Sequence, residues 1–136
     1  MKKAIFLLSM IFTILSGCSK DENTSFDYDI NLLYGTWRVT HVMQSNGTYF
    51  DVTTNVGESV FEPTYAIFNA NGSYSGSGKF GTGSGTYTAI GKTITTFVSG
   101  KEYLKYDVVS LTGTTAELIM SETGSTSTLK IKVTKQ

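Results

Sequence analysis

Hydrophobic and polar residues alternate along nearly all of the chain from residue 35 onward. In residues 35–44, for example, Trp37 and Val39 alternate with Arg38 and Thr40. A period of two places successive side chains on opposite faces of a strand, so each such stretch predicts a strand with one buried and one wet face. No stretch shows the i, i+3, i+4 apolar spacing of an amphipathic helix. The pattern predicts an all-β domain.

Short turn signals, such as Asn71-Gly72 and Gly91-Lys92, divide this region into strands of regular length. The expected strands cover residues 35–44, 64–69, 73–80, 84–90, 93–98, 102–111, 115–121 and 127–135. Because short turns join consecutive strands, we expect a single antiparallel up-and-down meander. Closing the meander removes its exposed edges. The result is a barrel of about eight strands, whose interior is just wide enough for side chains or one small ligand.

Residues 45–63 interrupt the regular series of strands. They include Asn46-Gly47 and Pro63, which disfavour a continuous strand. We expect a long loop that crosses one end of the barrel, and long loops often carry function. Glu58 and Glu62 flank this loop, where they either line an entrance to the barrel or are simply solvated.

The N-terminus has the features of an export signal. Lys2 and Lys3 precede an uncharged run at residues 4–15, which leads to Leu15-Ser16-Gly17-Cys18. As a helix this run would reach only about 18 Å, short of the ~30 Å core of a bilayer, so it predicts a secretory signal and not a membrane span. The residues up to Cys18 resemble the bacterial lipobox. That resemblance implies that residues 1–17 are a removed lipoprotein signal peptide and that Cys18 becomes a lipidated N-terminus.

Residues 18–33 are expected to form the lipidated N-terminus and a flexible linker of about 20 Å, ahead of a barrel domain at residues 34–136. Asp21 and Glu22, close behind the cysteine, resemble the surface-export signal of lipoproteins from the Bacteroidetes group. The alternative is an ordinary solvated tether. We therefore expect a protein of the cell envelope, anchored to the outer membrane by its N-terminal lipid, with surface exposure left open.

Three motifs in the barrel region resemble the lipocalin superfamily. They are Gly35-Thr36-Trp37 at the start of the first strand, the segment from Phe68 to Tyr74, and Gly85-Thr86-Tyr87. More narrowly, residues 33–135 are similar to the small lipocalin-like, or calycin-type, lipoproteins of Bacteroidetes. The resemblance implies a barrel that binds a small apolar or amphipathic ligand. In secreted lipocalins a late arginine packs over the motif tryptophan, whereas the last strand here offers only lysines: Lys130, Lys132 and Lys135.

Composition narrows the chemistry available to this domain. One cysteine and one histidine exclude a disulfide framework. They also leave almost no side chains of the kinds that metal sites and catalytic triads need. Without residues 1–17, 9 basic side chains oppose 11 acidic ones, a net charge of −2 that argues against nucleic acid as a partner. Residues 76–81 satisfy a lone G-x-G-x-x-G, but a strand follows where a dinucleotide site needs a helix. We expect no enzymatic activity, no cofactor and no metal.

Parity along the strands identifies candidate ligand-binding residues. Aromatic and polar side chains expected to point inward are Trp37, His41, Tyr65, Tyr74 and Tyr87, together with the apolar Ile67, Leu118 and Met120. The hydroxyl groups of buried tyrosines need partners, which a ligand or water would supply.

Two hypotheses remain open. In the first, the barrel is a binding module that holds a small apolar or amphipathic ligand at its open end near residues 45–63. In the second, the barrel is filled, and the protein is an accessory or interaction lipoprotein of a cell-surface complex with contacts through its loops.

Surface display predicts that protease added to intact cells digests the domain. The expected result is loss of the full-length band on an immunoblot, with a periplasmic marker left intact. A domain that stays protected until the outer membrane is broken would show that Asp21 and Glu22 belong to an ordinary tether.

Overall fold

The computed structural model describes residues 25–136; the predicted signal peptide, Cys18 and the acidic pair Asp21 and Glu22 lie outside the described residues. The elements are η1 (Ile30–Leu32), β1 (Gly35–Met43), β2 (Tyr49–Asp51), α3 (Asn55–Val60), β3 (Tyr65–Phe68), β4 (Ser73–Ser77), β5 (Gly83–Ile90), β6 (Thr93–Val98), β7 (Lys101–Leu111), β8 (Thr115–Glu122) and β9 (Thr128–Lys135). Neither helix in this part of the chain has the length and hydrophobicity needed to cross a membrane.

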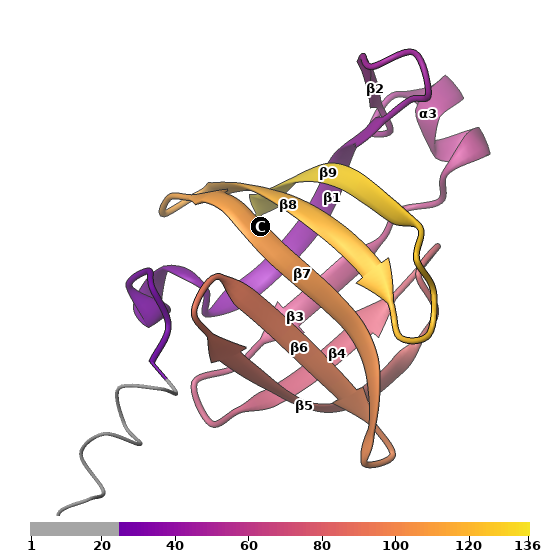
Figure 1. Ribbon diagram of the computed structural model, residues 1–136. Helices are drawn as coiled ribbons and strands as arrows, with labels where there is room; N and C mark the ends of the chain where they lie inside the picture. The colour runs from indigo at the N-terminus through magenta and orange to yellow at the C-terminus, as the bar shows by residue number, and fades with distance from the viewer. Residues whose placement is uncertain (1–24) are drawn as a thin grey trace, which may run out of the picture.

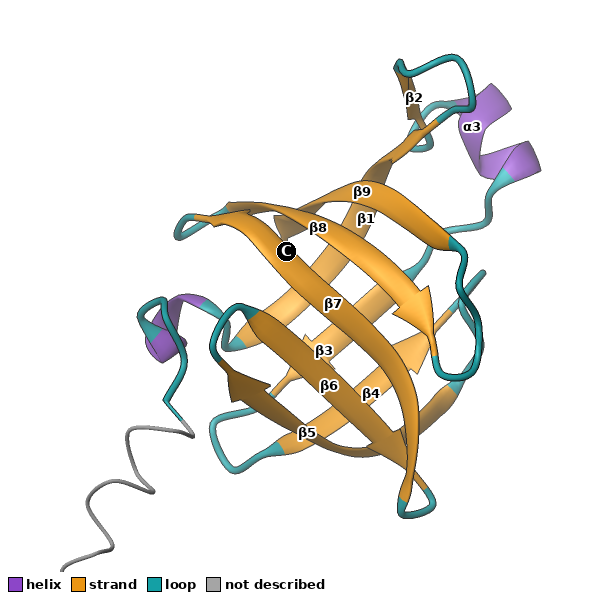
Figure 2. Cartoon of the chain, viewed as in Figure 1, coloured by secondary structure: helices purple, strands orange, loops and turns teal. Residues whose placement is uncertain are grey.

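Eight of the strands form a closed antiparallel barrel (Figure 1, Figure 2). Their order is β1-β3-β4-β5-β6-β7-β8-β9, and β9 returns to pair with β1 along Trp37–Val42. The ninth strand, β2, stands outside the ring and pairs only with the end of β1. The prediction of an all-β, up-and-down, lipocalin-like barrel is confirmed.

Because the strands run up and down, their connections gather at two ends. The proximal end holds the N-terminal segment 25–34 and the turns at residues 69–72, 91–92 and 112–114. The distal end holds residues 44–64 and the connections 78–82, 99–100 and 123–127. In Figure 1 the N-terminal segment and the β2–α3 region lie at opposite ends of the barrel.

The expected flexible linker is wrong for its second half, residues 25–33. Phe26 forms a bridge with Gly91, and the Tyr28 hydroxyl donates a hydrogen bond to the Val108 carbonyl at 3.2 Å. Leu33 is only 3 % exposed. The apolar side chains of this segment pack against the barrel core, and burying them offsets the entropy of ordering the chain. Within the described residues, the packed domain therefore includes the nine residues 25–33 ahead of its expected start at residue 34.

Residues 45–63 form β2 and the short helix α3 instead of an irregular loop across the barrel mouth. Figure 1 shows both standing out from the distal end. The Thr54 side chain caps α3 by accepting a hydrogen bond from the Gly57 amide at 2.9 Å. Gly57 packs directly on the backbone of Val52, which is itself buried in the core. A helix this short shows no sequence periodicity, because it has fewer than two full turns.

Packing between β5 and β6 depends on a glycine. A Cβ atom at Gly85 would overlap the Phe97 carbonyl, whereas one at Gly83 would lie 3.5 Å from the Val98 side chain. We predict that Gly85→Ala lowers the free energy of unfolding by about 1–3 kcal/mol. The matched variant Gly83→Ala should leave it unchanged or raise it by a few tenths of a kcal/mol. Urea denaturation measures both, and equal losses would contradict this packing.

Candidate functional site

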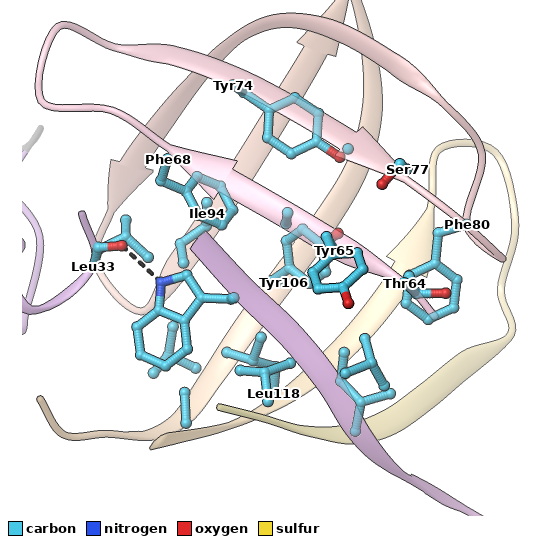
Figure 3. A pocket seen from close by; sticks show the side chains of 18 of the residues that line it. Leu33, Thr64, Tyr65, Phe68, Tyr74, Ser77, Phe80, Ile94, Tyr106 and Leu118 are labelled. Carbon is cyan, nitrogen blue, oxygen red and sulfur yellow. Dashed lines mark hydrogen bonds between the residues drawn. The ribbon is translucent and has the colours of Figure 1, made fainter. Parts of the chain in front are cut away.

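The barrel interior was the predicted ligand site, and side chains fill it (Figure 3). The space left for solvent is about 30 Å³. A water molecule needs about 10–15 Å³ of such volume, so the interior has room for roughly two. Its lining includes Leu33, Trp37, Phe68, Tyr74, Phe80, Ile94, Tyr106 and Leu118. Sequence reasoning missed Phe68, Phe80 and Tyr106; the alternation of Leu104, Tyr106 and Val108 was the available signal for the last.

Trp37 is buried, as predicted, and the structure places it at the proximal end. Its indole N–H donates a hydrogen bond to the Leu33 carbonyl at 2.8 Å, which satisfies the one polar atom of the ring (Figure 3). The Lys135 ammonium lies 5.1 Å from the ring centroid and donates to the Leu32 carbonyl at 2.9 Å. A lysine here takes the place over the tryptophan that the resemblance assigns to an arginine.

The predicted inward tyrosines Tyr74 and Tyr87 are buried, and protein groups satisfy their hydroxyls. Tyr87 donates to the Asn69 carbonyl at 2.8 Å. Tyr74 hydrogen bonds to Tyr106, and burial raises the pKa of both phenols. No ligand is needed to complete these hydrogen bonds. Tyr87 does not line the small cavity; its ring packs edge-on against Phe68, with centroids 5.0 Å apart.

The inward orientation predicted for Tyr65 and Ile67 is wrong. Trp37 pairs with Ala66, so Ala66 shares the inner face, and Tyr65 alternates to the outer face opposite Arg38. The Arg38 guanidinium lies 5.9 Å from the Tyr65 ring centroid. Tyr65 is half-buried and is still one of the residues that line the small cavity. The alternation located strand β3 correctly, but it assigned the inward positions one residue out of phase. An error of one residue moves every side chain of a strand to the other face.

The orientation predicted for His41 is wrong for a different reason. A β-bulge between Val39 and His41 inserts Thr40 as an extra residue, so the phase of β1 changes there. Val42 then faces inward, opposite Ile131, while His41 faces outward, opposite Lys132. The half-exposed imidazole has its Nε2 4.0 Å from an Asp51 carboxylate oxygen. It does not touch the barrel interior.

The distal end of the barrel is closed by packed side chains. The rings of Phe61 and Phe80 meet edge-on with centroids 5.6 Å apart. The buried Thr64 hydroxyl accepts a hydrogen bond from the Lys79 amide at 2.8 Å, which ties the β4–β5 connection to the start of β3. The Tyr103 hydroxyl donates to the Phe80 carbonyl. An open mouth near residues 45–63 is therefore not present.

Residues 25–136 contain no group of three or more His, Cys, Asp or Glu side chains that could hold a metal ion. Glu58, one of the two loop carboxylates singled out in the sequence, instead pairs with Arg38 at 2.6 Å and fastens α3 to the outer wall. The contact of Glu62 is made by its backbone: its carbonyl accepts a hydrogen bond from the Thr64 hydroxyl at 2.9 Å.

The Tyr49 phenol makes a long-range contact on the outer wall. It donates a hydrogen bond to Glu117 at 2.6 Å, joining β2 to β8. Burial, this hydrogen bond and the negative charge of Glu117 together raise the pKa of Tyr49 to about 12. Because the raised pKa belongs to the folded state, its contribution to stability is present below pH 10 and is lost as the pH rises through 12.

Replacing Glu117 with glutamine removes one of the three causes of this shift, the negative charge, and weakens a second, because an amide oxygen is a poorer hydrogen-bond acceptor than a carboxylate. We predict that Glu117→Gln lowers the pKa of Tyr49 toward 10, with a remainder above it because burial persists. The difference in ultraviolet titration between each protein and its Tyr49→Phe counterpart isolates this phenol from the other tyrosines. An unchanged Tyr49 titration in Glu117→Gln would show that the contact with Glu117 does not hold the phenol.

Comparison with known proteins agrees with the barrel geometry. A family model described as a lipocalin-like domain matches residues 33–118, from the buried Leu33 into β8. No curated protein and no solved structure matches the chain. The matched region is more than half of the chain and includes Trp37 and strands β1 to β7, whereas β9, which also pairs with β1 at Trp37, lies beyond it. The chain belongs to the lipocalin-like domain family.

Proposed function

We propose that this protein is a lipid-anchored, non-enzymatic binding module of the outer membrane, whose filled barrel is a scaffold for contact with a protein partner. The observation that carries the proposal is the interior volume of about 30 Å³. Ligand sites usually enclose about 300–1,000 Å³. A small apolar ligand inside the barrel would have to displace several packed aromatic side chains. Lipocalin-like domains are a binding fold. Because the interior of this barrel is filled, the outer surfaces remain as the place where a partner would bind.

The proposed anchor is the lipidated Cys18, and it sets which end of the barrel faces outward. Seven residue steps separate Cys18 from Ser25, and a fully extended chain covers at most about 3.3–3.6 Å per residue, or roughly 25 Å. Ser25 is tied to the proximal end through the hydrogen bond that its carbonyl accepts from Gly91. A short tether at the proximal end supports an orientation in which the distal end points away from the membrane.

The distal end exposes two large apolar side chains. Val56 and Val60 are 67 % and 62 % exposed and lie one helical turn apart on α3. Between them, the ion pair of Glu58 with Arg38 fixes which face of the helix turns outward. The ion pair holds α3 in place, so the two exposed valine side chains form a fixed apolar surface. A partner with an apolar surface of its own would bury them. We propose this face of α3 as the contact.

Photo-cross-linking in intact cells tests this contact. We predict that a photoreactive residue at Val60 gives one discrete adduct, and that Val56→Ser reduces its yield severalfold without changing the melting temperature. A photoreactive residue at Thr88, exposed on the barrel wall, is the control and should give no such adduct. Equal labelling from both positions, or an adduct indifferent to Val56→Ser, would contradict the proposal.

Point changes are required because deleting residues 45–63 would remove Val52 and Phe61, which are buried in the core. Loss of a partner after such a deletion would report unfolding and not a lost contact.

A further inference from the structure

A second hollow lies on the outer wall of the barrel, and its lining includes no residue of the proposed partner contact on α3. Its volume is about 350 Å³, within the range of sites for small ligands. Strands β1, β7, β8 and β9 form it. The polar side chains that line it are Thr40, His41, Ser110, Thr115, Glu117, Lys132 and Thr134.

Two β-bulges flank the hollow. One lies in β1, where Thr40 is the extra residue, and the other in β7, where Val109 is the extra residue opposite β8. A bulge bends its strand and increases the local twist. Strands β8 and β9, which pair with each other without a register shift, lie between the two bulged strands. The hollow is thus built into the strand register and does not depend on a loop.

The register also aligns a row of charged and polar side chains across this wall. Asp51 pairs with His41, His41 with Lys132, and Lys132 with Glu117. The Tyr49 ring lies over this row, with the Lys132 ammonium 4.4 Å from its centroid and its hydroxyl on Glu117. The hydrogen bond from Tyr49 occupies only Oε2 of Glu117, the oxygen that also lies 4.0 Å from the Lys130 ammonium, and leaves Oε1 free.

Three donors in the hollow have no hydrogen-bond or ion-pair partner within residues 25–136. They are the Lys132 ammonium and the hydroxyls of Ser110 and Thr134. The positive charge of Lys132 is matched by the negative charge of Glu117, so the lining has no net charge. An anionic ligand would meet Glu117, and a cationic one would meet Lys132. A neutral ligand with several hydroxyls, each able to donate and accept, matches these groups.

We propose that this outer-wall hollow binds a neutral polyhydroxylated ligand, a monosaccharide or the terminal sugar of a glycan. Lys132 and Thr134 donate to its hydroxyl oxygens, and Glu117 accepts through the oxygen that Tyr49 leaves free. The hollow is open to solvent, so the expected dissociation constant for a single sugar is of the order of 1 mM. The site is distinct from the α3 contact, because neither Val56 nor Val60 lines it.

Amide chemical shifts of the full chain, kept in a detergent whose headgroup carries no sugar, test the proposal. The probes are glucose, galactose and N-acetylglucosamine, added separately up to about 50 mM. At least one should give saturable shifts at Thr40, Ser110 and Thr134. Thr134→Val and Lys132→Met should each weaken binding at least about fivefold, while the matched control Thr88→Val should leave it unchanged.

Each variant is first required to reproduce the wild-type spectrum away from the substitution, so that unfolding is not read as lost binding. Absence of saturable shifts with all three sugars would overturn the proposal. So would binding that survives Thr134→Val unchanged. Tighter binding of inorganic phosphate or glycine betaine at the same amides would also overturn it, because it would show recognition of charge.

Discussion

The burial of Trp37 at the seam between the first and last strands is the contact on which the rest of this barrel depends. Trp37 pairs with Ala66 of β3 on one side and with Lys135 of β9 on the other, so it stands where the ring closes. Its indole N–H is satisfied by Leu33, which draws the N-terminal segment across the proximal end. Lys135 covers the ring from above. One side chain therefore contacts the strands that close the barrel and the N-terminal segment that covers its proximal end. It thereby also fixes where the chain leaves the barrel toward the proposed anchor.

The interior of the barrel is filled because the closed ring has only eight strands. An eight-stranded barrel has an interior that either side chains or one small ligand can occupy, and aromatic residues occupy it here. Phe68 is at the centre, with ring centroids of Tyr74, Tyr87 and Tyr106 at 5.5, 5.0 and 6.3 Å. Each such pair adds about 0.5–1.5 kcal/mol beyond the area it buries. Opening a ligand cavity would forfeit these contacts and leave tyrosine hydroxyls without partners.

The outer surface then carries the features available for recognition. The same strand register that fills the interior aligns Asp51, His41, Lys132 and Glu117 on the outside. Two bulges shape that wall into a hollow, and a short capped helix presents Val56 and Val60 at the distal end. Both candidate surfaces follow from local departures from a regular barrel, while the regular part provides the rigid support.

Strand positions and the fold class were predictable because alternation and turn residues act locally. Trp37, Tyr74 and Tyr87 were correctly placed inside for the same reason. His41 was misplaced because a bulge at Thr40 leaves no mark in the alternation, and Tyr65 because its four-residue strand is too short to establish a phase. The ordered segment 25–33 was missed because its polar residues mask the spacing of the apolar ones that pack. The outer-wall hollow was missed because cross-strand neighbours exist only once the register is known.

The filled interior is the central claim, and native mass spectrometry of the purified full chain tests it most directly. A filled interior predicts a mass equal to that of the processed and acylated polypeptide, with no further component released by collisional activation below the unfolding threshold. An additional noncovalent mass of a few hundred daltons that survives gentle desolvation and is lost on activation, in the wild type and in Thr134→Val alike, would show a ligand inside the barrel. That result would contradict the claim.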